Sequence, residues 1–367
     1  MTDLQGLLDH HVDTGTLPGA VALVADGDRV EVATAGHHDR TGTTPMSRDS
    51  IFRIASLTKP ITAAAVLVLV DDGTLALTDP IGRWLPELAS PMVVRTPASP
   101  VDDVVPVARP ITVYDLLTSQ AGWGWAADFD LPAVRALSAV QRDGREPQTF
   151  PSTDRWLADL GQVPMLYQPG ESFLYDTCSA IQGALVERVA GSFPDFLAER
   201  VFAPLSMVDS GFAVSATDRF TSYYKGDELA DGPDGQWATM PAFPLGSGGL
   251  AGTVDDWLAF ARMLLAGGQP VLSAESVRLM TTDHTTAAQR EIGAMFLQGQ
   301  GWGMGGSVDI APIESWTVPG RYGWVGGTGT TAYLVPSTGR VTILYTQLAT
   351  DGPEPPEWLF DFWRLTQ

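Results

Sequence analysis

The chain has 367 residues, of which 44% are hydrophobic, enough to bury a large core in one long domain or in two closely packed ones. Its formal net charge of −21 repels phosphates and anionic lipid, so we expect neither a nucleic-acid partner nor a membrane partner. Cys178 is the only cysteine, which excludes an intrachain disulfide, and no apolar run reaches the ~18 residues of a membrane-spanning helix. The composition leaves the oligomeric state open.

The sequence carries neither a secretory signal nor a metal-binding pattern. The N-terminal segment lacks a basic stretch followed by an apolar one, so the sequence as given predicts a cytoplasmic protein. The histidines form no pair at the i, i+3 or i, i+4 spacing that places two ligands on one helix face, and no Cys/His cluster exists, so we expect no metal site. The histidines are His10, His11, His37, His38 and His284.

Both ends of the chain carry β-hairpin signals. Residues 20–35 contain two β-rich runs on either side of Asp26-Gly27-Asp28. Residues 331–335 and 340–345 flank a turn segment, 336–339, in the same way. Two hairpins at opposite ends of the chain suggest one sheet closed by both termini, with residues 357–365 forming a short amphipathic helix packed on it.

The middle of the chain is predicted to be mostly helical. Residues 86–110, rich in Pro and Val, and residues 225–243, rich in Gly, Asp and Pro, are interpreted as long loops. We therefore divide the chain into an α/β sheet domain of residues 1–75 and 245–367 and a mostly helical domain of residues 76–244. The expected helices cover residues 112–118, 156–160, 179–190, 193–201 and 255–266.

Residues 51–73 carry the most informative pattern. After Pro60 this segment is apolar almost all round, which predicts a buried helix that ends near Gly73. Pro60 suits the first helical turn, so Ser56 falls at or just before the helix N-terminus, where the dipole and the free N–H groups favour a developing oxyanion. Lys59, three residues on, shares the face of Ser56. In a water-poor place it can lose its proton and accept that of the serine.

The same residues have a simpler interpretation, a helix-capping serine followed by a surface lysine, because a bare S-x-x-K spacing is weakly specific. Composition counts against it. Lys59 and Lys225 are the only lysines among 22 basic residues. A chain that otherwise uses arginine, but keeps a lysine at the mouth of a buried helix, indicates a need for a small, titratable amine.

Residues 52–60, FRIASLTKP, resemble the first motif of the serine β-lactamases, DD-peptidases and related esterases. The resemblance continues in LPGA at 17–20, in ITVYDLLTSQAG at 111–122, where Ser119 stands in place of the usual histidine, and in short segments at 168–170, 203–207 and 248–250. It implies an α/β (α+β) fold of the β-lactamase type. Such a fold has an antiparallel sheet that is built from both chain ends and flanked by helices, with an inserted, mostly helical region.

The second motif of class C β-lactamases and DD-peptidases is Tyr-x-Asn, and here it reads Tyr175-Asp176-Thr177. The resemblance implies that Tyr175 shuttles protons between the serine, water and the leaving group. Without Ser56 and Lys59, this tyrosine would be interpreted as an ordinary half-buried aromatic. Thr177 replaces the asparagine that helps to position the lysine and a substrate amide, which puts amide recognition in doubt.

The third motif of the family is usually Lys-Thr-Gly or His-x-Gly, and the Trp-x-Gly that begins at Trp324 looks like the carboxylesterases of this fold. By resemblance, the backbone N–H groups of Ser56 and Gly327 form the oxyanion hole, and Gly326 lets the substrate carbonyl approach the strand. The same glycines also fit an ordinary tight turn. Trp123 is a further candidate for the acyl pocket, although tryptophans more often pack in the core.

These residues predict a serine hydrolase that cleaves a small-molecule carboxylic ester through an acyl-enzyme and needs no cofactor. Ser56 is the expected nucleophile, and Lys59 and Tyr175 are the expected base system. An alcohol in place of water would make the protein a transacylase. A β-lactamase or D-amino peptidase/amidase is the main alternative, but Trp324 offers no cation for its anionic substrates, and Arg321 is the nearest candidate in sequence. A non-catalytic binding member of the fold is a third possibility.

Overall fold

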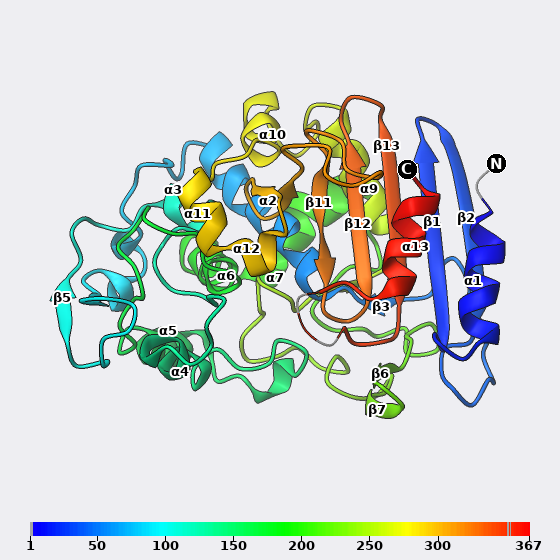
Figure 1. Cartoon of the computed structure of the whole chain (residues 1–367), viewed down its shortest axis with the longest axis horizontal. Helices are drawn as coiled ribbons and strands as arrows, with labels where there is room; N and C mark the ends of the chain where they lie inside the picture. Colours follow the sequence, from blue (N-terminus) through cyan, green and yellow to red (C-terminus); the bar gives the residue numbers. More distant parts are fainter. Residues whose placement is uncertain (1–2, 351, 353) are drawn as a thin grey trace.

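A seven-stranded antiparallel sheet built from both ends of the chain forms one side of the molecule (Figure 1). The computed structural model describes residues 3–350, 352 and 354–367. The strand order is β2-β1-β13-β12-β11-β10-β9. Its strands are β1 (Gly19–Asp26), β2 (Arg29–Gly36), β9 (Gly301–Trp302), β10 (Ser307–Val308), β11 (Tyr322–Gly326), β12 (Thr330–Val335) and β13 (Arg340–Thr346).

Both predicted hairpins are confirmed, and they lie beside each other in the sheet. Asp26 pairs with Arg29 across a two-residue turn in which Gly27 has a φ of +59°, and β12 pairs with β13 up to Val335 and Arg340. β1 then pairs antiparallel with β13, which joins the two ends of the chain. The predicted fold class, an antiparallel sheet closed by both termini, is therefore correct.

Helices cover both faces of this sheet. Ala22 and Val24 of β1 pack in a cluster with α1 (Leu4–Asp13) and α13 (Glu357–Leu365), whereas Val21 and Leu23 point into the large central core. The second face is covered by α9 (Val254–Leu265), which contacts β1, β12 and β13. Because β1 is buried on both faces, it is apolar at nearly every position. The predicted C-terminal helix is confirmed and buries Trp358, Leu359, Phe362 and Trp363.

The helix predicted after Pro60 is α2 (Thr58–Asp71), and it runs through the centre of the core. Its residues from Thr58 to Leu69 are all buried, which explains why the segment is apolar all round. It packs against α6 (Thr177–Ala190), the π-helical turn η5 (Ala198–Phe202) and α10 (Ala274–Met280). A helix held on every side is a rigid base for the residues at its N-terminus.

The remaining predicted helices are present, whereas two predicted loops contain strands. Residues 86–110 hold the hairpin β4–β5, in which Val93 pairs with Val105, and residues 225–243 overlap the hairpin β6–β7. In β6–β7 the two-residue turn Gly226-Asp227 favours a hairpin, and in β4–β5 the β-branched valines favour strands. These local preferences explain why the two segments contain strands although their overall composition predicted loops. The other elements are β3 (Phe52–Arg53), β4 (Met92–Val94), β5 (Val104–Pro106), α3 (Val113–Leu117), α4 (Pro132–Ser138), α5 (Thr153–Leu160), α7 (Phe193–Leu197), α8 (Ala203–Leu205), β6 (Tyr223–Lys225), β7 (Glu228–Asp231), β8 (Ala251–Gly252), α11 (Ala287–Ile292) and α12 (Ala294–Leu297).

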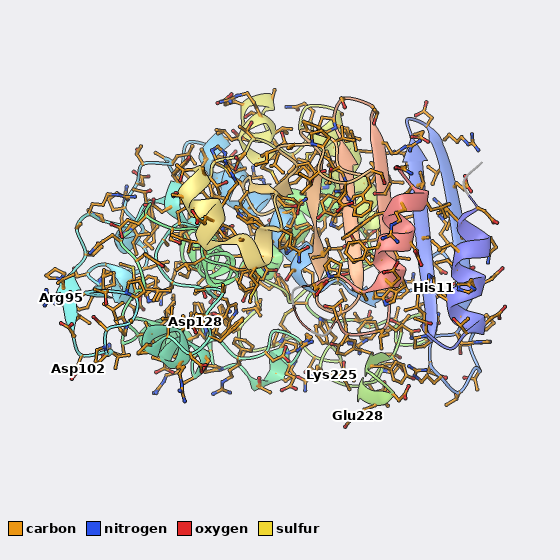
Figure 2. The ribbon with its side chains drawn as sticks, viewed as in Figure 1. His11, Arg95, Asp102, Asp128, Lys225 and Glu228 are labelled. Atoms are coloured by element: carbon orange, nitrogen blue, oxygen red, sulfur yellow. The ribbon has the colours of Figure 1, made fainter. Side chains whose placement is uncertain are left out.

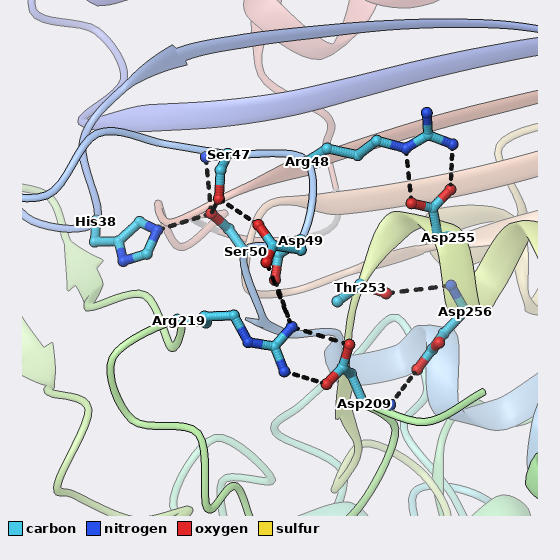
Figure 3. Close-up of polar contacts among 10 residues, drawn as sticks. All are labelled: His38, Ser47, Arg48, Asp49, Ser50, Asp209, Arg219, Thr253, Asp255 and Asp256. Carbon is cyan, nitrogen blue, oxygen red and sulfur yellow. Dashed lines mark hydrogen bonds and ion pairs between the residues drawn. The ribbon is translucent and has the colours of Figure 1, made fainter. Parts of the chain in front are cut away.

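The inserted helical region lies beside the sheet, and the two are tied together by polar contacts. In Figure 2, Arg95 and Asp102 mark the β4–β5 end of the molecule, and His11 marks α1 at the opposite end. One of the polar contacts is the 3.0 Å hydrogen bond that the backbone N–H of Asp209, in the inserted region, donates to the Asp256 carboxylate near the start of α9 (Figure 3). None of the described helices is both long and apolar enough to cross a membrane.

Candidate active site

Ser56 lies in a 3₁₀ turn, η1 (Ala55–Leu57), that leads directly into α2. The preceding residue, Ala55, has a φ of +44°, a conformation that costs an alanine energy and that often occurs next to functional side chains. This turn places Ser56, half-buried, at the positive end of a buried helix, as its position before Pro60 predicts.

The side chains of Lys59 and Tyr175 converge on Ser56. The Lys59 Nζ lies 2.9 Å from the Ser56 Oγ, and the Tyr175 phenolic oxygen lies 2.9 Å from the same atom. The Lys59 Nζ is also 4.6 Å from the centre of the Tyr175 ring. The structure therefore brings Tyr175 into contact with Ser56 and Lys59, although Ser56 and Tyr175 are 119 positions apart in the sequence.

Two aromatic side chains hold the Tyr175 ring. The Trp324 indole N–H donates a 2.7 Å hydrogen bond to the Tyr175 oxygen, and the Phe296 ring stacks on the tyrosine at 4.8 Å. The backbone of Tyr175 is bridged to Trp125 by hydrogen bonds of 2.9 and 3.1 Å. The phenolic oxygen is thereby fixed between Trp324 and Ser56.

Asp176 is a site residue that the sequence analysis missed. Its carboxylate accepts a 2.6 Å hydrogen bond from the Lys59 Nζ and a 2.8 Å hydrogen bond from the Gln141 amide. Thr177, in contrast, does not face the substrate space. It is the first residue of α6, is fully buried, and its hydroxyl has no partner within the described residues. The expected role of Thr177 is corrected, because the carboxylate of the preceding residue takes the place beside Lys59.

The charge of Lys59 is set by this neighbour. Burial by itself lowers the pKa of Lys59, but the adjacent Asp176 carboxylate and the Tyr175 oxygen raise it by more, so its pKa lies above the ordinary lysine value. The water-poor setting therefore acts in the expected direction, but the Asp176 carboxylate and the Tyr175 oxygen outweigh it. The side chain is fully buried, and it lies there as half of an ion pair.

Strand β11 supplies the opposite wall of the site. Trp324, Gly326 and Gly327 line a cavity at Ser56, and among the described residues the Gly327 N–H has no hydrogen-bond partner. A Cβ on Gly326 would overlap the Thr330 hydroxyl and lie 2.6 Å from the Ile54 carbonyl, whereas a Cβ on Gly327 would meet no atom within 4 Å. Packing therefore requires glycine at 326, and the open space lies at 327.

Two cavities meet at Ser56. One, of about 270 Å³, is mostly apolar and is lined by Phe129, Phe296, Trp324 and Leu359. The other, of about 400 Å³, is more polar; its lining residues include Trp125, Gln141, Arg142, Asp143, Arg145 and Asp176. A carbonyl carbon bound at Ser56 could thus extend an apolar group in one direction and a polar group in the other.

Two further candidates lie away from Ser56. Trp123 is 1% exposed, and its indole donates a hydrogen bond to the Val163 carbonyl, so its expected place in the acyl pocket is corrected to a place in the core. Arg321 is buried, pairs with Asp309 at 3.3 Å and stacks on Tyr333. It lines neither cavity at Ser56.

Within the described part of the chain, no group of three His, Cys, Asp or Glu side chains could hold a metal ion. A nucleophile candidate that is hydrogen-bonded to a lysine and a tyrosine lies at the start of a buried helix and beside the end of β11, where the Gly327 N–H has no partner among the described residues. This arrangement defines a class of serine hydrolases. The family model described as Beta-lactamase matches residues 4–361, and the chain belongs to this family.

The chain is similar to relatives of full length. Protein Rv1367c of Mycobacterium tuberculosis (strain ATCC 25618 / H37Rv) is 38% identical over 361 residues, which cover 92% of this chain and 88% of that protein. Esterase EstB of Burkholderia gladioli is 30% identical, covering 96% and 92% of the two chains. The solved structure of "EstCE1, a hydrolase with promiscuous acyltransferase activity" superposes with a TM-score of 0.83 over 99% of this chain and 97% of that one, at 24% identity, which supports the fold.

Proposed function

We propose that this protein is a serine carboxylesterase in which Ser56 attacks the ester carbonyl. The observation that carries the proposal is the pair of 2.9 Å contacts that the Ser56 oxygen makes with Lys59 and Tyr175 at the junction of the two cavities. A hydroxyl at that junction has a proton relay on one side and substrate space on the other.

In the proposed reaction, the Ser56 oxygen bonds to the carbonyl carbon while its proton passes to the Tyr175 oxygen. In the same step the phenolic proton of Tyr175 passes to the alcohol oxygen of the ester, so Tyr175 stays neutral; the ester bond then breaks, the alcohol leaves neutral and the acyl group stays on Ser56. The same relay, run with water, releases the acid. The N–H groups of Ser56 and Gly327 stabilise the negative charge on the carbonyl oxygen.

The cavity linings support an uncharged ester as the substrate. Apolar side chains dominate the smaller cavity, and the one charged side chain among its described lining residues, Glu354, is itself an acid. Arg321, the cation nearest to Trp324 in sequence, is committed to Asp309, so it is not free for a β-lactam or peptide carboxylate. The name of EstB, a relative that is 30% identical, also points to esters.

Acyl transfer to an alcohol is the second candidate, and the larger polar cavity favours it. A bound alcohol there would take the place of water in the second step, with the same proton relay. Product analysis of a p-nitrophenyl ester in the presence of added alcohols separates the two, since a transferase forms a new ester and a pure hydrolase forms only the acid.

The experiment that tests the proposal is labelling with a fluorophosphonate, which reacts with activated serines, alongside turnover of p-nitrophenyl butyrate. We expect one adduct on Ser56 and turnover in the wild type, and neither in Ser56→Ala. Ser138→Ala, which removes an exposed serine of α4, is the matched control and should label like the wild type. A wild-type protein that neither labels nor turns over esters would contradict the proposal.

A further inference from the structure

The Lys59 amine makes three short contacts, and all three partners can accept a hydrogen bond. They are the Asp176 carboxylate at 2.6 Å, the Ser247 carbonyl at 2.7 Å and the Ser56 hydroxyl at 2.9 Å. An ammonium ion has three N–H donors and no acceptor, so it matches this set completely. A neutral amine has two donors and one lone pair, so it would need the Ser56 hydroxyl to donate to it, and it would lose the ion pair with Asp176.

The chain adopts a strained conformation to bring Asp176 to this place. Asp176 has φ +82° and ψ −60°, and the Thr177 N–H donates back to the Tyr175 carbonyl at 3.2 Å. This is a three-residue γ-turn of the rarer, strained form. Strain of this kind persists where the surroundings hold it, and here it directs a carboxylate to the lysine beside the nucleophile.

A second residue holds the carboxylate in position. The Gln141 amide, fully buried at the end of the segment that follows α4, donates 2.8 Å to the Asp176 oxygen that does not contact Lys59. The Ser247 hydroxyl approaches the same oxygen at 3.4 Å. Both oxygens of Asp176 therefore have hydrogen-bond donors, which hold the carboxylate in place beside Lys59.

Few other charges act on Lys59. Among the described residues, Asp176 is the one acidic side chain within ion-pair distance of its amine. In the neighbouring polar cavity, Arg145 is paired with Asp143 at 2.8 Å, and Arg142 is exposed. On the apolar side, the charged side chain among the described lining residues is Glu354.

We propose that Asp176 is a positioning residue that holds Lys59 in place as an ammonium ion, so that Lys59 serves as a fixed positive charge beside Ser56 and Tyr175 and does not take the serine proton. The proposal rests on the proposed function, since it concerns the same nucleophile. In this arrangement Tyr175 is the group through which the proton passes, and Lys59 stabilises negative charge on the two oxygens it faces.

The chain offers a direct measurement, because Lys59 and Lys225 are its only lysines. Full-length protein labelled with carbon-13 at the lysine ε position should give two NMR signals, and Lys225→Arg assigns them. We expect the Lys59 signal to stay that of an ammonium ion at least to the pH at which Lys225 titrates. In Asp176→Asn the Lys59 midpoint should fall by about one pH unit or more, because burial remains while the opposite charge is gone.

Gln141→Leu is the matched control, since it removes the amide contact but leaves the carboxylate, and its Lys59 midpoint should stay close to that of the wild type. Asp176→Glu keeps the charge and should keep the ammonium signal, which covers the case in which Asp176→Asn does not fold. An unchanged midpoint in Asp176→Asn, or a Lys59 that is already neutral near pH 7 in the wild type, would overturn the proposal.

The pH profile of fluorophosphonate labelling provides the functional readout. If Lys59 acts as a fixed charge, the labelling rate of Asp176→Asn should fall at a lower pH than that of the wild type as the pH is raised. The difference between these two pH values should equal the difference between the Lys59 NMR midpoints of the two proteins. If Lys59 accepted the serine proton, Asp176→Asn would instead label faster than the wild type near pH 7, and this outcome overturns the proposal. A wild type that does not label at all would contradict the esterase, while the NMR titration would still decide the charge of Lys59.

Discussion

The Trp324 indole nitrogen lies 2.7 Å from the Tyr175 oxygen and donates a hydrogen bond to it. By the resemblance described above, related enzymes that act on anionic substrates place a cation at this point of the third motif. Here the side chain contacts the proposed proton relay and also forms an apolar wall of the smaller cavity. One residue thus orients the tyrosine and shapes the space for an uncharged group.

Trp324→Phe separates these two roles. Phenylalanine keeps an aromatic wall but has no N–H, so we expect kcat for p-nitrophenyl butyrate to fall by about 2- to 15-fold, the worth of one neutral hydrogen bond, with KM nearly unchanged. Tyr175→Phe, which removes the relay itself, should lose about 100-fold or more. Steady-state kinetics of both variants checks this, and equal losses would show that the indole N–H does not act through Tyr175.

The substrate preference follows from the missing cation. We expect kcat/KM for p-nitrophenyl acetate and butyrate to exceed that for nitrocefin or penicillin G by at least ~100-fold, since a charge-assisted hydrogen bond to a carboxylate is worth about 1.5–3 kcal/mol. Comparable values would point to another cation. Arg142, which lines the polar cavity and has no acidic partner among the described residues, is the candidate, and Arg142→Ala should then abolish the β-lactam activity alone.

The adjacent glycines Gly326 and Gly327 should respond differently to alanine. Gly326→Ala brings a methyl group against Thr330 and the Ile54 carbonyl, so the free energy of unfolding should fall by about 1–3 kcal/mol. Gly327→Ala has room for its methyl and should fold normally, but that methyl enters the space beside Ser56, so kcat/KM should fall. Urea unfolding and ester kinetics of both variants check the contrast, which would fail if Gly327→Ala were the less stable of the two.

Asp256, near the start of α9, should make stability depend on pH. Burial raises its pKa from 3.8 to about 6, although the Ser210 hydroxyl and the Asp209 N–H donate to its carboxylate. Figure 3 shows this carboxylate on the α9 side of the network formed with Asp209 and Arg219. Between pH 3.8 and about pH 6, Asp256 holds up to one more proton in the folded protein than in the unfolded chain. The contribution of Asp256 to the free energy of unfolding therefore decreases as the pH rises through this interval.

Asp256→Asn removes this titration while keeping an amide oxygen for the two donors. The measured quantity is the free energy of unfolding of the variant minus that of the wild type at the same pH. We expect this difference to be higher at about pH 7.5 than at about pH 4.5, by about 1–3 kcal/mol. Urea unfolding of both proteins at the two pH values measures the difference directly. An effect of the substitution that is the same at both pH values would contradict the prediction.

Local patterns were sufficient to predict a large part of the fold. The Asp26-Gly27-Asp28 turn, the apolar run after Pro60 and the helix at the C-terminus each depend on neighbours within a few residues, and the structure contains all three. The contact between Ser56 and Lys59 is of the same kind, since both lie within one turn at the start of α2. The contact with Tyr175 came from the family resemblance, because no local pattern links residues 119 positions apart.

The sequence by itself determined the sheet ends, the central helix and the Ser56–Lys59 pair, because backbone periodicity and helix geometry are local properties. The tertiary structure alone decided which side chain near Tyr175 faces the lysine, since the positive φ at Asp176 turns that carboxylate inward and leaves Thr177 buried in α6. It also decided that Arg321 is held by Asp309 and that Trp123 lies in the core. A side chain's direction and its ion-pair partner depend on segments far apart in the chain, and only packing brings those segments together.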